Sequence, residues 1–169
     1  YNTQNVWYNA ANTAQRANVK GNTYFTDAGL TFQGIYSGGN ATIAHASSMN
    51  VANVMTVVAW INQANTTGFK TIVAKNDAAY SRGFEFYMND GTPSAYVRPD
   101  IANNVLEFAP ALANGSWHCV AFSYDGINLR GYSNGQFRGV STGIANGATD
   151  TIGNLRNCTT LALNQNQLN

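Results

Sequence analysis

The sequence predicts an all-β fold, a two-sheet antiparallel sandwich or jelly roll, on two observations. Helical periodicity is nearly absent, because no window of about twelve residues keeps apolar positions at i, i+3, i+4 and i+7. Short strand-like runs instead alternate with Asn-Gly and Asp-Gly pairs, which accept the positive φ of tight hairpin turns. At 169 residues the chain is about one domain, long enough to bury a core without a metal or a disulfide.

The first part of the chain differs from the rest, since residues 1–28 are rich in Asn and Ala with isolated aromatic residues. We expect an N-terminal arm that packs on the sandwich or on a neighbour. A short surface helix over NAANTAQRANVK is the alternative. The predicted organisation is an arm over residues 1–28 and a jelly-roll domain over residues 29–169.

Two apolar runs in the middle of the chain predict strands. VMTVVAWI (54–61) is β-branched and apolar on both faces, as expected for a strand buried inside a two-sheet sandwich. KTIVAK (70–75) follows it along the chain.

The next pair of strands shows period-2 alternation. In GFEFYM, Phe84 and Phe86 lie on one side and Glu85 and Tyr87 on the other, so one face is predicted to be core and the other exposed. SAYVR (94–98) is expected to pair with this strand across the turn NDGTP.

The later part of the chain reads as an antiparallel meander. Its stretch WHCVAFSYDGINLRGYSNGQFRGV contains two hairpin turns, and we expect Trp117, Val120 and Phe122 to be buried in it. The C-terminal TLALNQNQLN predicts one more short strand and a polar tail. The turn pairs that bound the meander are NG at 114–115, DG at 125–126, NG at 134–135 and NG at 146–147.

Composition excludes two partner classes. Charged residues make up only 10% of the chain, against about 25% in an average soluble domain, and the net charge is +1. The basic residues are scattered singly, which argues against nucleic acid and against an anionic membrane surface, because both require clustered Lys and Arg. No run approaches the ~18 apolar residues of a membrane-spanning helix.

The chain has two cysteines, Cys119 and Cys158. A bridge between them is one interpretation, but a chain of this size does not need it, and Cys119 lies in an apolar strand-like run. We therefore expect two free thiols.

From about Leu30 to Leu155 the order of motifs resembles the laminin-G-like domains of the concanavalin A-like lectin and glucanase superfamily. The matching motifs are LTFQGIYSGGNATIAHASSMNV, VMTVVAWI, TIVAK and GFEFYMNDG. The most specific are WHCVAFSYDG and LRGYSNGQ, which are similar to the family's W-H-x-V-A strand and its Y-D-G and Y-x-N-G turns. The resemblance implies a concanavalin A-like jelly-roll sandwich of two antiparallel sheets.

The chain departs from the family pattern at its end. The family usually closes with a strand that carries an Ile-Asp motif and an I-Y-N-R-A-L stretch, and nothing after Asn157 matches it. Either the chain is truncated, or TLALNQNQLN or the N-terminal arm occupies that edge of the sheet. An open edge invites pairing, so we expect other protein subunits as partners, through the N-terminal arm or an open sheet edge.

The superfamily includes glycan-cleaving enzymes, which hold a carboxylate pair on one sheet face. This chain has only two Glu, Glu85 and Glu107, and neither matches the E-x-D-x-x-E pattern of the glucanases. The Arg/Glu/Arg strand of the lyases is absent as well. No nucleophile motif accompanies His45 or His118. We therefore expect no enzymatic activity.

Calcium is common in laminin-G-like relatives, where an Asp and loop carbonyls hold it at the rim of the sandwich. Asp77, Asp90 and Asp125 are candidates by residue type. Turn chemistry explains Asp90 and Asp125 without a metal. Asp77 remains the candidate calcium ligand, and no other cofactor is expected.

Polar and aromatic side chains recur on the predicted solvent side of the strands. The candidate ligand-binding residues are Tyr87, Tyr96, Arg98, Arg130 and Tyr132. Sugars stack on aromatic faces and hydrogen-bond to Asn, Asp and Arg, so such residues suit a glycan platform. The alternative is that they are ordinary exposed strand residues that support their cross-strand neighbours.

These features predict a non-catalytic recognition or adhesion module that binds a glycan or glycoprotein on a larger extracellular or virion assembly. Its location is then extracellular, at a cell surface or at a virion surface. One alternative is a structural or decoration protein of a virion or surface array with no glycan ligand. The other, a glycan-cleaving enzyme, is disfavoured by the missing carboxylates.

Overall fold

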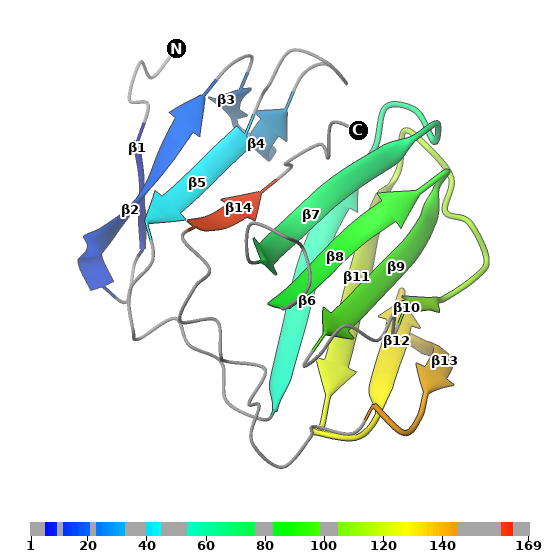
Figure 1. Ribbon diagram of the computed structural model, residues 1–169. Helices are drawn as coiled ribbons and strands as arrows, with labels where there is room; N and C mark the ends of the chain where they lie inside the picture. Colours follow the sequence, from blue (N-terminus) through cyan, green and yellow to red (C-terminus); the bar gives the residue numbers. More distant parts are fainter. Residues whose placement is uncertain are drawn as a thin grey trace.

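The computed structural model describes residues 6–9, 12–20, 23–32, 40–44, 54–76, 83–98, 105–144 and 160–163, and every regular element among them is a β-strand (Figure 1). None of these residues belongs to a helix long and apolar enough to cross a membrane. The strands are β1 (Val6–Asn9), β2 (Asn12–Lys20), β3 (Thr23–Thr26), β4 (Gly29–Phe32), β5 (Asn40–Ala44), β6 (Met55–Asn62), β7 (Phe69–Asn76), β8 (Gly83–Asn89), β9 (Thr92–Arg98), β10 (Val105–Glu107), β11 (Trp117–Tyr124), β12 (Leu129–Ser133), β13 (Gln136–Ser141) and β14 (Thr160–Leu163).

Two antiparallel sheets face each other. The larger has eight strands in the order β1-β2-β5-β14-β7-β8-β9-β10, and the smaller has four in the order β13-β12-β11-β6. In Figure 1, β7, β8 and β9 lie in front and β6 and β11 behind them. The hairpin β3-β4 forms a separate two-stranded sheet. The predicted all-β jelly-roll sandwich is confirmed.

The main core lies between the two sheets, and aromatic rings connect its layers. The ring centroid of Phe86 in β8 lies 5.3 Å from that of Phe122 in β11 and 6.0 Å from that of Phe108. Phe84 also faces Phe122, at 6.3 Å. The alternation in GFEFYM therefore places its phenylalanines in the core, as predicted.

Two of the predicted hairpin turns have the backbone that their sequences predict, whereas at the pairs 114–115 and 125–126 only the glycine has positive φ. Asp90 and Gly91 join β8 to β9 with φ of 46° and 81°, and Asn134 and Gly135 join β12 to β13 with φ of 51° and 76°. Both central residues of each turn thus have positive φ, the geometry that Asn-Gly and Asp-Gly accept most readily. The predicted NG turn at 146–147 lies outside the described residues.

The prediction that VMTVVAWI is buried on both faces is wrong. β6 is the last strand of the four-stranded sheet, and its side chains alternate between the core and solvent. Only one side of this sheet faces the other sheet, so the second apolar face of β6 is exposed. Trp117 was also expected to be buried, but 49% of its surface is exposed, because it lies on the same outer side.

The N-terminal segment contributes strands. β2 pairs with β5 in the large sheet, and Ala17 and Val19 pack against Ala41. The helix alternative is therefore wrong over residues 12–20, while the division at residue 28 stays a prediction. The expected C-terminal strand is present as β14, which lies between β5 and β7 and so does not occupy an outer edge.

Candidate functional site

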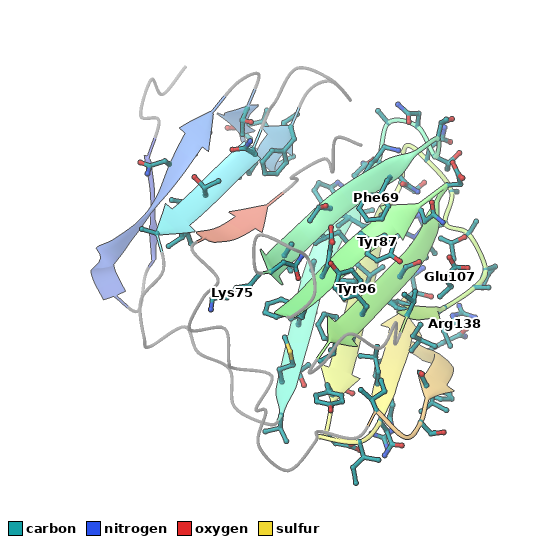
Figure 2. All side chains as sticks on the ribbon, in the orientation of Figure 1. Phe69, Lys75, Tyr87, Tyr96, Glu107 and Arg138 are labelled. Carbon is teal, nitrogen blue, oxygen red and sulfur yellow. The ribbon has the colours of Figure 1, made fainter. Side chains whose placement is uncertain are left out.

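The tyrosines of β8 and β9 are buried, so the expectation that they face solvent is wrong. Tyr87 and Tyr96 are only 7% and 4% exposed. Phe69 stacks on Tyr87 with ring centroids 4.2 Å apart, and Figure 2 shows Phe69, Tyr87 and Tyr96 on the neighbouring strands β7, β8 and β9. A sugar ring cannot stack on an aromatic face that is already covered.

A buried carboxylate explains part of this packing. Glu85 is 1% exposed, and its two oxygens accept hydrogen bonds from the Thr71 hydroxyl at 2.6 Å and the Tyr96 hydroxyl at 2.8 Å. A charge removed from water requires such partners. Glu85 and Tyr96 therefore form a buried polar network on the large sheet, where the sequence predicted a solvent-exposed face.

Two further candidates are not tested by the geometry. Arg98 ends β9, but its side chain lies outside the described part of the chain, as does the candidate calcium ligand Asp77. Among the described residues, no three His, Cys, Asp or Glu side chains gather as a metal site. Asp90 connects its turn to Gly68, just before β7, since its carboxylate accepts the Gly68 N–H at 2.7 Å and its own N–H donates to the Gly68 carbonyl at 3.2 Å.

Arg130 and Tyr132 do lie on an accessible surface, the side of the four-stranded sheet that points away from the core. We call it the outer face. The β-sheet register aligns its side chains in rows that cross all four strands. One row is Phe137, Tyr132, Ala121 and Val58, and the next is Val140, Arg130, Ser123 and Thr56.

Large apolar side chains are exposed on the outer face. Val58, Trp60 and Phe137 are 61%, 68% and 57% exposed. Single exposed apolar residues are normal on a protein surface, but a group of them on one sheet face marks an interaction surface. The outer face is therefore a candidate interaction surface, and its β12–β13 side is the candidate binding site.

An aromatic pair lies on the β12–β13 side of this face. The rings of Tyr132 and Phe137 are edge-to-face, with centroids 5.8 Å apart and planes inclined by 64°. Tyr132 is half-buried and Phe137 exposed, so the pair offers a rigid apolar surface to solvent.

A polar cluster of Asp125, Asn128 and Arg130 adjoins the aromatic pair. Arg130 Nη1 lies 2.5 Å from Asp125 Oδ2, and Asn128 Nδ2 donates to the same oxygen at 3.1 Å. The other oxygen, Asp125 Oδ1, accepts the backbone N–H groups of Ile127 at 3.0 Å and Asn128 at 2.7 Å. This Asx turn fixes the carboxylate at the end of β11.

The hydrogen bonds of the polar cluster keep both Asp125 and Arg130 ionised. The Arg130 guanidinium, helped by the side-chain and backbone N–H groups of Asn128, holds the pKa of the Asp125 carboxyl well below its usual range. The hydrogen bond to Asp125 in turn raises the pKa of Arg130. The cluster is therefore an ion pair with no net charge.

A shallow open depression of about 450 Å³ lies beside the polar cluster. Its lining residues come from β6, β11 and their ends: Val54, Met55, Thr56, Ser123, Tyr124 and Asp125. The hydroxyl of the buried Tyr124 lies 2.9 Å from the carbonyl oxygens of both Gly126 and Ile144, which share its one proton. Burial raises the pKa of Tyr124.

His118 has a structural role. Its Nε2–H donates to the Ala113 carbonyl at 3.0 Å, and its Nδ1 accepts from Asn134 Nδ2 at 3.1 Å. Cys119 next to it is a free, half-buried thiol on the outer face, opposite Trp60. His118 and Cys119 thus point to opposite sides of β11, and Cys158 lies outside the described residues.

Sequence reasoning missed Val58, Trp60, Trp117 and Phe137. The signal was present in VMTVVAWI, whose second apolar face was assigned to burial inside the sandwich. In an antiparallel two-sheet fold each sheet has only one partner, so a second apolar face is available for binding.

Comparisons with known proteins agree with this fold. The family model of the concanavalin A-like lectin/glucanases superfamily matches residues 36–160. No curated protein matches the chain in sequence. Domains LG4-5 of the mouse laminin alpha1 chain superpose with a TM-score of 0.64 at 15% identity, covering 87% of this chain and 37% of that one.

Two further solved structures share the fold. CBM40 of the Ruminococcus gnavus IT-sialidase, bound to alpha2,3 sialyllactose, superposes with a TM-score of 0.57 at 13% identity, covering 69% of this chain and 66% of that one. A structure of botulinum neurotoxin type C, whose cell entry is described as dependent on two ganglioside molecules, gives 0.69 at 10% identity, covering 92% and 39%. The chain thus spans less than two thirds of each of these structures.

At these identities the structural likeness shows the fold alone, whereas the family match covers most of the chain, including β6 and the β11–β13 meander. The sequence match and the two facing antiparallel sheets lead to one conclusion: the chain belongs to the concanavalin A-like lectin/glucanases superfamily.

Proposed function

We propose that this chain is a non-catalytic recognition module that binds a glycan or a glycoprotein through the β12–β13 side of the outer face. The observation that carries the proposal is the aromatic pair Tyr132–Phe137 beside the polar cluster of Asp125, Asn128 and Arg130. Here exposed aromatic carbon lies beside hydrogen-bonding groups that are held in fixed positions.

The chemistry of the site suits a sugar. The apolar face of a pyranose stacks on aromatic carbon, while its hydroxyl groups need donors and acceptors at fixed positions. Asn128 and Arg130 supply donors and Asp125 supplies acceptor oxygens, and all three are fixed by mutual hydrogen bonds. Because they are already ordered, binding does not have to immobilise them, which favours affinity.

The relatives give the proposal a setting. The CBM40 structure contains sialyllactose, and the neurotoxin structure is described with ganglioside interaction. By analogy, which is the weaker support, we place this chain outside the cell, at a cell surface or on a virion surface. The alternative, a structural protein of a virion or surface array, is favoured by one observation, the exposed apolar side chains of β6.

The glutamates support the non-catalytic part of the proposal. Glycoside hydrolysis needs an acid and a nucleophile or base that face the scissile bond. Glu85 is buried and hydrogen-bonded to Thr71 and Tyr96, and Glu107 lies on β10 at the edge of the large sheet (Figure 2). Both lie on the large sheet, whereas the proposed site lies on the outer face of the four-stranded sheet.

A glycan array with the whole chain, followed by calorimetry on the best soluble oligosaccharide, tests the proposal. Tyr132→Ala should weaken binding at least tenfold because it removes the stacking ring, whereas Tyr132→Phe should retain most of it. Arg130→Gln should also weaken binding, because it releases the Asp125 carboxylate. Val105→Ala, an exposed position on the large sheet, is the matched control and should bind normally.

Two results would count against the proposal. The first is the absence of saturable binding to any glycan on the array. The second is binding that persists unchanged in both Tyr132→Ala and Arg130→Gln. Release of reducing sugar from polysaccharides would instead support the alternative that the chain is a glycan-cleaving enzyme.

A further inference from the structure

Among the described residues, β6 is an outer strand of the four-stranded sheet. It pairs with β11 along its whole length, from Met55 opposite Tyr124 to Asn62 opposite Trp117, without a register shift. Within the described residues no strand pairs with its other side, and Figure 1 shows β6 at the margin of the rear sheet beside β11. β6 is thus an eight-residue edge strand of the described sheet, and its pairing with β11 is regular.

The hydrogen bonds of neighbouring residues reveal which backbone groups face this margin. The N–H and C=O of Cys119 both bond to Asn134, at 3.1 Å and 2.7 Å, on the side away from β6. Cys119 and the opposite Trp60 therefore form a non-hydrogen-bonded pair, so the N–H and C=O of Trp60 also point away from β11.

Backbone N–H and C=O groups alternate in direction along a β-strand, so every second residue of β6 points the same way as Trp60. The N–H and C=O groups of Thr56, Val58 and Asn62 point to the free margin, as those of Trp60 do. Gln63 is an odd number of residues from Trp60, so its backbone groups should point toward β11. Its carbonyl does accept the Gly115 N–H on that side, at 2.8 Å.

The sequence and the pairing of β6 lack three features that usually prevent strand pairing. Proteins protect exposed edges with charged side chains, proline or β-bulges. β6, MTVVAWIN, has no charged residue and no proline, and its pairing with β11 has no bulge. Its outer side chains are among the most exposed apolar groups of the described residues, with Val58 at 61% and Trp60 at 68%.

We propose that β6 is a self-association edge, at which two copies of this chain pair antiparallel about a twofold axis. If Val58 of one copy lies opposite Trp60 of the other, Thr56 lies opposite Asn62, and every margin-facing N–H and C=O of these four residues finds a partner. Two apolar and two polar cross-strand pairs then form on the outer face. No like charges meet, because the strand carries none.

Such pairing joins the two four-stranded sheets into one continuous sheet with both outer faces on the same side. The aromatic pair Tyr132–Phe137 lies on β12 and β13, away from the paired edge, so it stays accessible in both copies. Two sites on one surface strengthen attachment to a multivalent surface without any new contact. The pairing itself does not depend on the proposed glycan function.

Molar mass by light scattering or sedimentation, from micromolar to hundreds of micromolar chain, tests the proposal. The wild-type chain should approach twice the 18.1 kDa of one copy as its concentration rises. Val58→Pro should stay a monomer at all these concentrations, because it removes one margin-facing N–H and leaves the bonds to β11 in place. Val140→Pro, on the edge strand β13 at the opposite margin of the same sheet, is the matched control and should still associate.

A second variant covers the case in which the proline impairs folding. Val58→Lys places a charge at the paired edge and should also give a monomer, with folding checked by circular dichroism. A wild-type chain that remains monomeric throughout, or one that associates equally in Val58→Pro and Val58→Lys, overturns the proposal. Binding of a monovalent sugar should be unchanged in these variants, so loss of self-association and loss of glycan binding are measured separately.

Discussion

At the scale of single residues, Gly131 shows how closely the core is packed. It lies on the inner side of β12, and a methyl group built on its Cα would overlap the ring of Phe108, which is fully buried and stacked on Phe86. We expect Gly131→Ala to lower the free energy of unfolding by about 1–3 kcal/mol, because the ring must leave its place in a close-packed core. Urea denaturation measures the change.

Gly139 is the matched control for Gly131. It lies opposite Gly131 on β13, and a methyl group there would meet only Leu106 Cδ1, at an ordinary contact distance of 3.5 Å. Gly139→Ala should leave stability within about 0.5 kcal/mol of wild type. Equal losses at both positions would mean that the Phe108 contact does not determine the cost.

The candidate site residues show how far sequence alone can go at this scale. Alternation correctly separated Tyr87 from Phe86 and Tyr132 from the core, because side chains on a strand point to opposite faces. It does not say whether the second face is exposed. Tyr87 became buried beside Phe69, while Tyr132 stayed accessible, and that difference depends on residues far away in the chain.

At the scale of elements, the turn between β12 and β13 is held by Asn134. Its φ of 51° is unusual for a residue with a side chain, and its amide bonds both the Cys119 N–H and His118 Nδ1, each at 3.1 Å. Asn134→Ala should cost about 1–2 kcal/mol of unfolding free energy, since it removes these bonds and leaves a β-carbon at positive φ. Urea denaturation again provides the measurement.

Asn134→Gly separates the two contributions. Glycine accepts positive φ without strain but makes no side-chain bonds, so this variant should be destabilised less than Asn134→Ala. If the alanine variant were as stable as wild type, neither the backbone conformation nor the side-chain bonds would hold the turn.

The elements themselves were largely predictable. Strong local signals, such as the alternation in GFEFYM and the Asn-Gly pair after LRGYS, fixed the strands β8 and β12 and the turns beside them. VMTVVAWI was identified as a strand but placed wrongly, because an apolar run cannot distinguish a strand buried on both faces from an edge strand with an apolar outer face.

At the scale of the whole molecule, pairings between distant segments escaped prediction. The sandwich could be inferred from the motifs of the meander, whose strands follow one another along the chain. The placement of β14 between β5 and β7, and the pairing of β2 with β5, join segments that no local pattern relates. The resemblance fixed the architecture but did not fix these connections, since the chain departs from the family at its end.

The whole molecule should keep its binding competence over a wide pH range. The pKa of Asp125 lies well below its usual range because of Arg130, so the ion pair that orders the site is lost only in strong acid. A lowered pKa contributes stability above the unfolded value of about 4, and this stability is fully present from pH 5 upward. Glycan affinity measured by calorimetry should therefore be constant from pH 5 to 9. A change in affinity within this range would show that the site contains a titrating group other than Asp125 and Arg130.

The alkaline limit has the opposite sign. Burial raises the pKa of Tyr124, so its contribution is complete below the unfolded value of about 10 and is lost as the pH rises through the folded value. Urea denaturation should show the wild-type chain losing stability above pH 10 more steeply than Tyr124→Phe, which has no proton to lose. At pH 7 the same variant should be less stable by about 1 kcal/mol, because the carbonyls of Gly126 and Ile144 lose their donor. If the stability of the two proteins fell equally above pH 10, a group other than Tyr124 would set the alkaline limit.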